Sequence, residues 1–68
     1  MTLGKLMELY KAEQEGKKII KRTWLYSNHM RPIHYDVEVI LSDCELDEFF
    51  NQRLFGNEYV NYEFFIKE

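Results

Sequence analysis

The sequence predicts one small α+β domain in which two helices pack on one face of a three-stranded sheet, in the order α-β-β-α-β. Three observations lead to this prediction. Apolar residues recur at helical spacing near the N-terminus, they alternate with polar residues in two later segments, and the segment between those two carries signals for both ends of a helix. The 68 residues form a single domain, 1–68, that buries only about 60% of the surface of its unfolded chain. Its stability margin should therefore be thin.

The first helix is predicted over residues 3–14. Thr2 is a suitable N-cap, and Gly16 is a suitable stop because glycine readily adopts the left-handed conformation beyond a helix C-terminus. Four apolar residues follow Thr2 at the spacing of one helical face and should point into the core: Leu3, Leu6, Met7 and Tyr10.

Two strands should follow, over residues 18–26 and 33–41, joined by a loop over residues 27–32. The first has one face with Ile20, Arg22, Trp24 and Tyr26 and another with Ile19, Lys21, Thr23 and Leu25, and the sequence does not decide which points inward. The second alternates clearly, because Ile33, Tyr35, Val37, Val39 and Leu41 are separated by His34, Asp36 and Glu38. We expect its apolar side to face the core.

The second helix is predicted over residues 42–55. Ser42 and Glu45 have the spacing of a capping box, Leu41 and Leu46 that of a hydrophobic staple, and Gly56 is placed to end the helix. Its buried stripe should consist of Leu46, Phe49, Phe50 and Leu54.

A third strand should begin after Gly56 and Asn57. Its inward residues would be Val60, Tyr62, Phe64 and Ile66, and its outward residues Asn61, Glu63, Phe65 and Lys67. This strand lies either parallel beside the second strand or antiparallel beside the first, and the sequence is compatible with both arrangements.

Charge is distributed unevenly along the chain, whose net charge is −3. Residues 1–34 contain seven Lys and Arg against three Glu, a net charge of +4, whereas residues 35–68 contain nine Asp and Glu against two basic residues, a net charge of −7. A single cysteine, Cys44, cannot form an internal disulfide, which favours a reducing, cytoplasmic setting. We find neither a signal peptide nor an apolar run of membrane-spanning length.

Candidate catalytic and metal-binding residues are few. His34, Asp36 and Glu38 share one side of a strand at a spacing that suits metal ligands or acid–base catalysis, but a solvated sheet face paired with Lys21 or Arg22 explains them better. His29 and Cys44 do not have zinc-site spacing, and Cys44 should be an incidental exposed or interfacial thiol. No motif brings a nucleophile, a base and an orienting group together, so we expect neither an enzyme nor a cofactor or metal site.

The acidic half of the chain suggests a binding surface. Spaced carboxylates could imitate a nucleic-acid backbone and occupy a basic groove on another protein, with exposed aromatic residues as anchors. The predicted partner-binding residues are Asp43, Glu45, Asp47, Glu48, Phe55, Glu58 and Glu63. An ordinary solvated helix face would contain the same carboxylates.

Two other functions are compatible with the sequence. The chain could bind a nucleotide-like signal between subunits through Lys21, Arg22, Trp24 and Arg31. It could also be a self-associating accessory protein of a virion, for which a homodimer is the simplest form. Direct nucleic-acid binding is disfavoured by the net negative charge.

The opening of the chain resembles short accessory proteins encoded by tailed phages and prophages. The similar residues are Met1-Thr2-Leu3-Gly4-Lys5-Leu6-Met7-Glu8-Leu9 and Gly16-Lys17-Lys18-Ile19-Ile20-Lys21-Arg22-Thr23-Trp24. One group of such proteins, the nucleotide-sequestering Thoeris anti-defence proteins, is similar in this opening only. The resemblance implies a phage protein acting in the host cytoplasm, where small acidic proteins inhibit host enzymes or defence complexes, including the CRISPR systems that anti-CRISPR proteins block.

Overall fold

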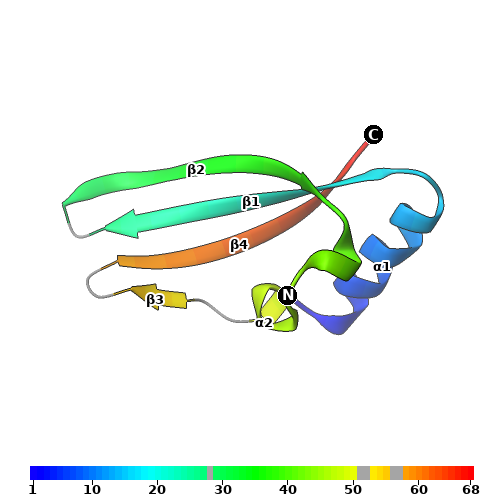
Figure 1. The fold of residues 1–68 in the computed structure, drawn as a ribbon, viewed down its shortest axis with the longest axis horizontal. Helices are drawn as coiled ribbons and strands as arrows, with labels where there is room; N and C mark the ends of the chain where they lie inside the picture. Colours follow the sequence, from blue (N-terminus) through cyan, green and yellow to red (C-terminus); the bar gives the residue numbers. More distant parts are fainter. Residues whose placement is uncertain (28, 51–52, 56–57) are drawn as a thin grey trace.

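The computed structural model of the protein describes residues 1–27, 29–50, 53–55 and 58–68. It contains two helices, a short 3-10 turn and four strands (Figure 1). In chain order these are α1 Leu3–Gln14, β1 Lys18–Ser27, β2 Met30–Val39, η1 Leu41–Asp43, α2 Leu46–Phe50, β3 Arg53–Phe55 and β4 Glu58–Lys67.

The α+β class and the order helix, strand, strand, helix, strand are confirmed. The three long strands β1, β2 and β4 form the predicted sheet, and the short strand β3 adds to its edge, which gives the order β2-β1-β4-β3. Strand β4 pairs antiparallel with β1, so the sheet takes the second of the two arrangements that the sequence left open. Every strand pairing in the sheet is antiparallel.

The strand register separates the sheet into two faces, because residues directly opposite one another point to the same side. The inner face contains Ile19, Lys21, Thr23 and Leu25 of β1, Ile33, Tyr35, Val37 and Val39 of β2, and Val60, Tyr62, Phe64 and Ile66 of β4. The outer face contains Ile20, Arg22, Trp24 and Tyr26 of β1, His34, Asp36 and Glu38 of β2, and Tyr59, Asn61, Glu63 and Phe65 of β4.

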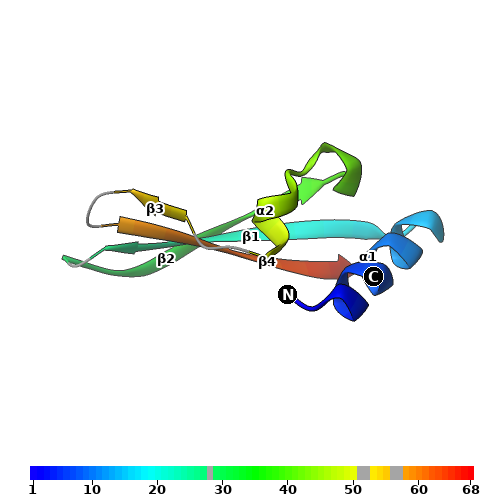
Figure 2. The same ribbon diagram turned by 90° about the horizontal axis from the view of Figure 1, so that it is seen from below.

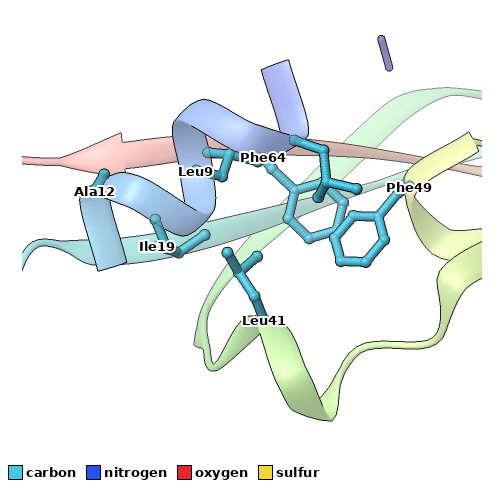
Figure 3. Close-up of a cluster of buried hydrophobic side chains, with 7 residues drawn as sticks. Leu9, Ala12, Ile19, Leu41, Phe49 and Phe64 are labelled. Carbon is cyan, nitrogen blue, oxygen red and sulfur yellow. The ribbon is translucent and has the colours of Figure 1, made fainter. Parts of the chain in front are cut away.

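The hydrophobic core lies on the inner face at one end of the sheet (Figure 3). Its buried residues come from both helices, from η1 and from two strands: Leu6, Leu9, Ala12, Ile19, Leu41, Phe49 and Phe64. The rings of Phe49 and Phe64 lie 4.9 Å apart, which joins α2 to β4. Both helices therefore pack on one face of the sheet, as predicted.

The long helix predicted over residues 42–55 is wrong. Residues Leu41–Asp43 form η1, Cys44 is extended, and α2 spans only Leu46–Phe50. Ser42 lies within η1 and so cannot cap α2. Of the three residues of the predicted stripe whose side chains are described, Phe49 is buried, whereas Leu46 is 71% and Phe50 44% exposed; the side chain of Leu54 lies outside the described part of the chain. Residues 54 and 55 belong to β3 rather than to the helix, and the predicted stop at Gly56 lies outside the described residues.

Two apolar faces also differ from prediction. Thr2 caps α1 as expected, and its hydroxyl accepts a hydrogen bond from the N–H of Lys5. The buried residues of the helix are Leu6, Leu9 and Ala12. Three of the four predicted core residues, Leu3, Met7 and Tyr10, are exposed. The apolar side of β2 shares the inner face, yet Ile33, Tyr35 and Val37 are exposed because the helices do not reach that part of the sheet. Only Val39, at the end of β2, packs against the core.

The molecule is elongated, with extents of 41 × 21 × 18 Å. The helices gather where β1 begins and β4 ends, and the half of the sheet that carries the β1–β2 hairpin and β3 projects beyond them (Figure 2). Neither helix in the described part of the chain has the length and apolar character needed to cross a membrane.

Candidate binding surface on the outer face of the sheet

An aromatic row crosses the outer face of the projecting half of the sheet. The rings of Tyr26 and Tyr59 stack at 4.5 Å with an angle of 5° between their planes, because these two residues lie directly opposite each other in the β1–β4 register. Trp24 lies 6.2 Å from Tyr26 on one side and 4.4 Å from His34 on the other. We call these four residues the aromatic row.

Charged pairs border the aromatic row. The guanidinium of Arg22 donates two hydrogen bonds to the carboxylate of Asp36, at 2.8 and 3.1 Å, and lies 4.6 Å from the ring centre of Phe65. The indole N–H of Trp24 donates to Glu63 at 2.6 Å, which fixes the orientation of the indole ring. The prediction that Lys21 or Arg22 pairs with the carboxylates of β2 is thus confirmed for Arg22.

The Arg22–Asp36 pair keeps both groups ionised. Hydrogen bonding to Arg22 lowers the pKa of Asp36, and hydrogen bonding to Asp36 raises the pKa of Arg22. Both side chains are solvated, so the ion pair adds little to the stability of the fold. Its main effect is to hold the two side chains in place on the outer face. Lys18 and Glu38 form a looser pair at 3.7 Å on the same face.

No described side chain on this outer face is buried, whereas the buried side chains of both helices belong to the inner-face core. An uncovered sheet face normally consists of polar residues, since antiparallel sheets expose one face to water. Aromatic residues in such a place are typical anchors of protein interfaces, because they combine large apolar area with few rotatable bonds. The aromatic row is therefore the best candidate for a binding surface.

The predicted acidic surface is only partly assembled. Asp43, Glu45, Asp47 and Glu48 lie together over η1 and α2. Glu48 is engaged by Lys21 at 3.3 Å, and both of these side chains are largely buried. Glu63 lies on the outer face beside Trp24 and so is separated from this segment. Phe55 and Glu58 have backbones in β3 and β4, but their side chains lie outside the described part of the chain.

The predicted nucleotide-binding residues do not converge on one site. Lys21 is on the inner face with Glu48, Arg22 and Trp24 are on the outer face, and Arg31 is near the hairpin end of β2. A hollow of about 100 Å³ beside Arg31, lined in part by Leu25 and Tyr59, is smaller than the roughly 300 Å³ or more of a typical ligand pocket. A wider, open hollow near the C-terminus is lined by Lys17, Lys18 and Lys67 and contains none of the four.

The candidate catalytic and metal-binding residues contact other side chains of the sheet. His34, Asp36 and Glu38 do share one face, but His34 contacts Trp24 and the two acids are paired with Arg22 and Lys18. Within the described ranges, no three His, Cys, Asp or Glu side chains are grouped to hold a metal ion.

Cys44 is partly buried against the core rather than exposed on a helix. Its thiol lies 3.6 Å from the carbonyl oxygen of Ile40, and burial raises its pKa, with a further contribution from Glu48. A raised pKa reduces the thiolate fraction, which does not suit a nucleophile.

Tyr26 and Tyr59 were not among the predicted site residues, and His34 was considered only for metal binding or acid–base catalysis. Alternation placed Trp24 and Tyr26 on one face of β1, and that was the available signal. The stacking of Tyr26 on Tyr59 depends on the β1–β4 register, which is known only once the fold is known.

We compared the chain with protein-family models, curated proteins and solved structures, and none of the three comparisons gave a match.

Proposed function

We propose that this protein is a non-enzymatic binding module that recognises a basic protein through the outer face of its sheet. The observation that carries the proposal is the aromatic row of Trp24, Tyr26, Tyr59 and His34 on a face that no helix covers. Trp24, Tyr26 and Tyr59 are half-buried, and a partner would remove their remaining surface from water and so gain further apolar burial.

Basic groups are the complementary chemistry for this surface. Lys and Arg bind over aromatic faces, and the seating of Arg22 on Phe65 shows that a guanidinium fits the spacing of side chains here. Glu63 supplies a carboxylate next to Trp24, and the net charge of −3 attracts a positive partner over longer distance.

Nucleic-acid-binding proteins are the partner class that we propose, because they present basic grooves. The phage-like opening of the chain supports a host defence protein as the specific target and the host cytoplasm as the setting. Bound there, the acidic segment 43–48 would add to the attraction, and the protein would act as an inhibitor by excluding nucleic acid from the groove.

Removal of a ring from the aromatic row should abolish capture of the partner. A pull-down from bacterial lysate, read by mass spectrometry, would identify a target with the unmodified protein as bait. Trp24→Ala and Tyr26→Ala should each weaken binding to that purified target by about thirtyfold or more, since interface anchors contribute about 2 kcal/mol or more. Titration calorimetry would measure the loss.

Phe50→Ala is the matched control for these two variants. Phe50 is an aromatic residue of α2 that is 44% exposed but lies away from the outer face, so its removal should leave binding unchanged. Circular dichroism would establish that all three variants keep the fold. Equal affinity for the Trp24→Ala, Tyr26→Ala and unmodified proteins would refute the proposed surface, and a captured target with an acidic surface would refute the proposed partner class.

A further inference from the structure

Strand β2 is a long edge strand of the sheet. It spans Met30–Val39 and has a neighbour on one side only, because the sheet order begins with β2. On its inner-face side Ile33 is 50%, Tyr35 53% and Val37 44% exposed. Natural proteins usually shorten, charge or cover such edges, because unpaired backbone groups beside apolar side chains recruit another strand.

We propose that β2 pairs with β2 of a second copy of this chain, antiparallel and with Tyr35 on the two-fold axis. The two sheets then become one continuous sheet across the dimer. This arrangement places Tyr35 opposite Tyr35 and Ile33 opposite Val37, so the exposed apolar stripe packs against itself.

Charge complementarity selects this register. With Tyr35 on the axis, His34 of each copy lies opposite Asp36 of the other on the outer face, and no two acids meet. An axis at Asp36 would place that carboxylate against itself, and an axis at Val37 would place Asp36 against Glu38. An axis at His34 would set Asp36 against Pro32 and give it no charged neighbour on the second copy.

Pro32 supports the same register through the backbone. Proline has no N–H, and within sheets it occurs in edge strands with its nitrogen directed away from the neighbouring strand. The β1–β2 register is irregular between Met30 and Ile33, where Pro32 lies, and regular from Ile33 to Val39. With the alternation of backbone groups continued through Pro32, those of His34, Asp36 and Glu38 would also point to the free side of β2. In the proposed pair His34 and Asp36 exchange N–H···O=C bonds in both directions, and the N–H of Glu38 reaches the carbonyl of Pro32. The missing N–H of Pro32 then costs little.

The position of Tyr35 in this arrangement can be tested by disulfide formation. Tyr35 would form a pair without mutual hydrogen bonds, in which the Cα atoms of opposite residues are about 4.5 Å apart, within the range that a disulfide spans. In a Cys44→Ala background, Tyr35→Cys should therefore convert almost completely to a disulfide-linked dimer under mild oxidation. Non-reducing gel electrophoresis and mass spectrometry would measure the dimer.

Ile33→Cys and Val37→Cys in the same background are matched controls, since both residues are similarly exposed on the same side of β2. Each would lie about 13 Å from its own equivalent across the axis, too far for a disulfide. Neither protein should cross-link alone, but a mixture of the two should form the mixed disulfide, because residue 33 lies opposite residue 37.

Three results would overturn the proposal. They are Tyr35→Cys remaining monomeric, Val37→Cys cross-linking to itself as readily as Tyr35→Cys, and a sedimentation profile of the unmodified protein that stays monomeric at the highest soluble concentration. None of these results bears on the aromatic row, so the dimer and the proposed binding function can fail separately.

Discussion

Cys44 shows how a single residue changes character once its surroundings are known. In the sequence it falls near a predicted helix N-terminus, where the helix dipole would favour a reactive thiolate. In the structure it lies in extended backbone between η1 and α2, packed against the core and close to the carbonyl oxygen of Ile40. Burial and Glu48 both disfavour its thiolate form.

We therefore predict that Cys44 is alkylated slowly at neutral and mildly alkaline pH. Because the pKa of the folded thiol is raised, its rate of reaction with iodoacetamide should lie below that of the same protein unfolded in urea. The same shift has a consequence for stability. The unfolded chain loses its thiol proton first, so the free energy of unfolding should fall as pH rises above the ordinary thiol pKa of about 8.5 towards the raised value.

Cys44→Ala should remove this part of the alkaline decline in stability, which urea titrations of both proteins at neutral and alkaline pH would detect. A thiol that reacts equally fast in the folded and unfolded protein would contradict the prediction.

At the scale of elements, the segment after β2 shows why strong local signals failed. A capping box contributes about 1 kcal/mol to a helix. Full burial of a leucine side chain contributes about 1.5–3 kcal/mol, and Leu41 is 1% exposed within the core. Its backbone N–H also donates to Glu13 of α1 at 2.9 Å, so η1 is held against the first helix. These tertiary contacts outweigh the capping signals of Ser42 and Glu45.

Leu41 and Leu46 provide a matched test of this explanation. Leu41→Ala should lower the free energy of unfolding by about 2–5 kcal/mol, as is usual for a buried leucine. Leu46→Ala should change it by about 0.5 kcal/mol or less, because Leu46 is 71% exposed. Urea denaturation followed by circular dichroism measures both changes. Similar losses of unfolding free energy for the two variants would contradict this explanation. They would support the predicted hydrophobic staple, in which Leu41 and Leu46 pack together.

The helices and strands were predictable from the sequence wherever a residue pattern continued over many positions. Alternation located β2 and β4, the β-branched and aromatic composition of residues 18–26 located β1, and the spacing after Thr2 located α1. What alternation could not supply was how far the helices extend over the sheet. For that reason it placed Ile33, Tyr35 and Val37 in the core, and for the same reason it gave no signal that Tyr26 meets Tyr59. Both facts depend on contacts between residues distant in the chain.

At the scale of the whole molecule, the core and the candidate binding surface occupy opposite ends. Seven buried residues from five elements close the end where β1 begins, while the aromatic row and the apolar part of β2 lie on the projecting half. The chain thus leaves for association the part of its sheet that its own helices do not stabilise. A partner on the outer face and a second copy at the β2 edge would use adjoining surfaces of that half, which share His34.

Strand β1 allows the unequal stability of the two ends to be measured within one element. It is paired with both β2 and β4 from Ile19 to Leu25, before an irregularity in the β1–β2 register, so the hydrogen bonding of its amides differs little along that length. Near Ile19 the strand is also covered by the core, whereas near Tyr26 it is not. An amide exchanges when its segment opens locally, and this opening breaks the packing contacts of the segment as well as its hydrogen bonds. A segment with fewer packing contacts therefore opens more often. Amides of residues 19–21 should therefore exchange more slowly than those of residues 24 and 25, after correction for the rates of the unfolded chain.

Hydrogen exchange followed by NMR at a concentration low enough to keep the protein monomeric would resolve these amides individually. Uniform protection along β1 would mean that the sheet opens only as one unit, and the projecting half would then be as stable as the core. At high concentration, protection should rise selectively for His34, Asp36 and Glu38 on the free edge of β2, because those are the amides that the second copy would engage. If exchange at these three amides does not depend on concentration, the low protection of the projecting half is a property of the monomer and the proposed dimer does not form.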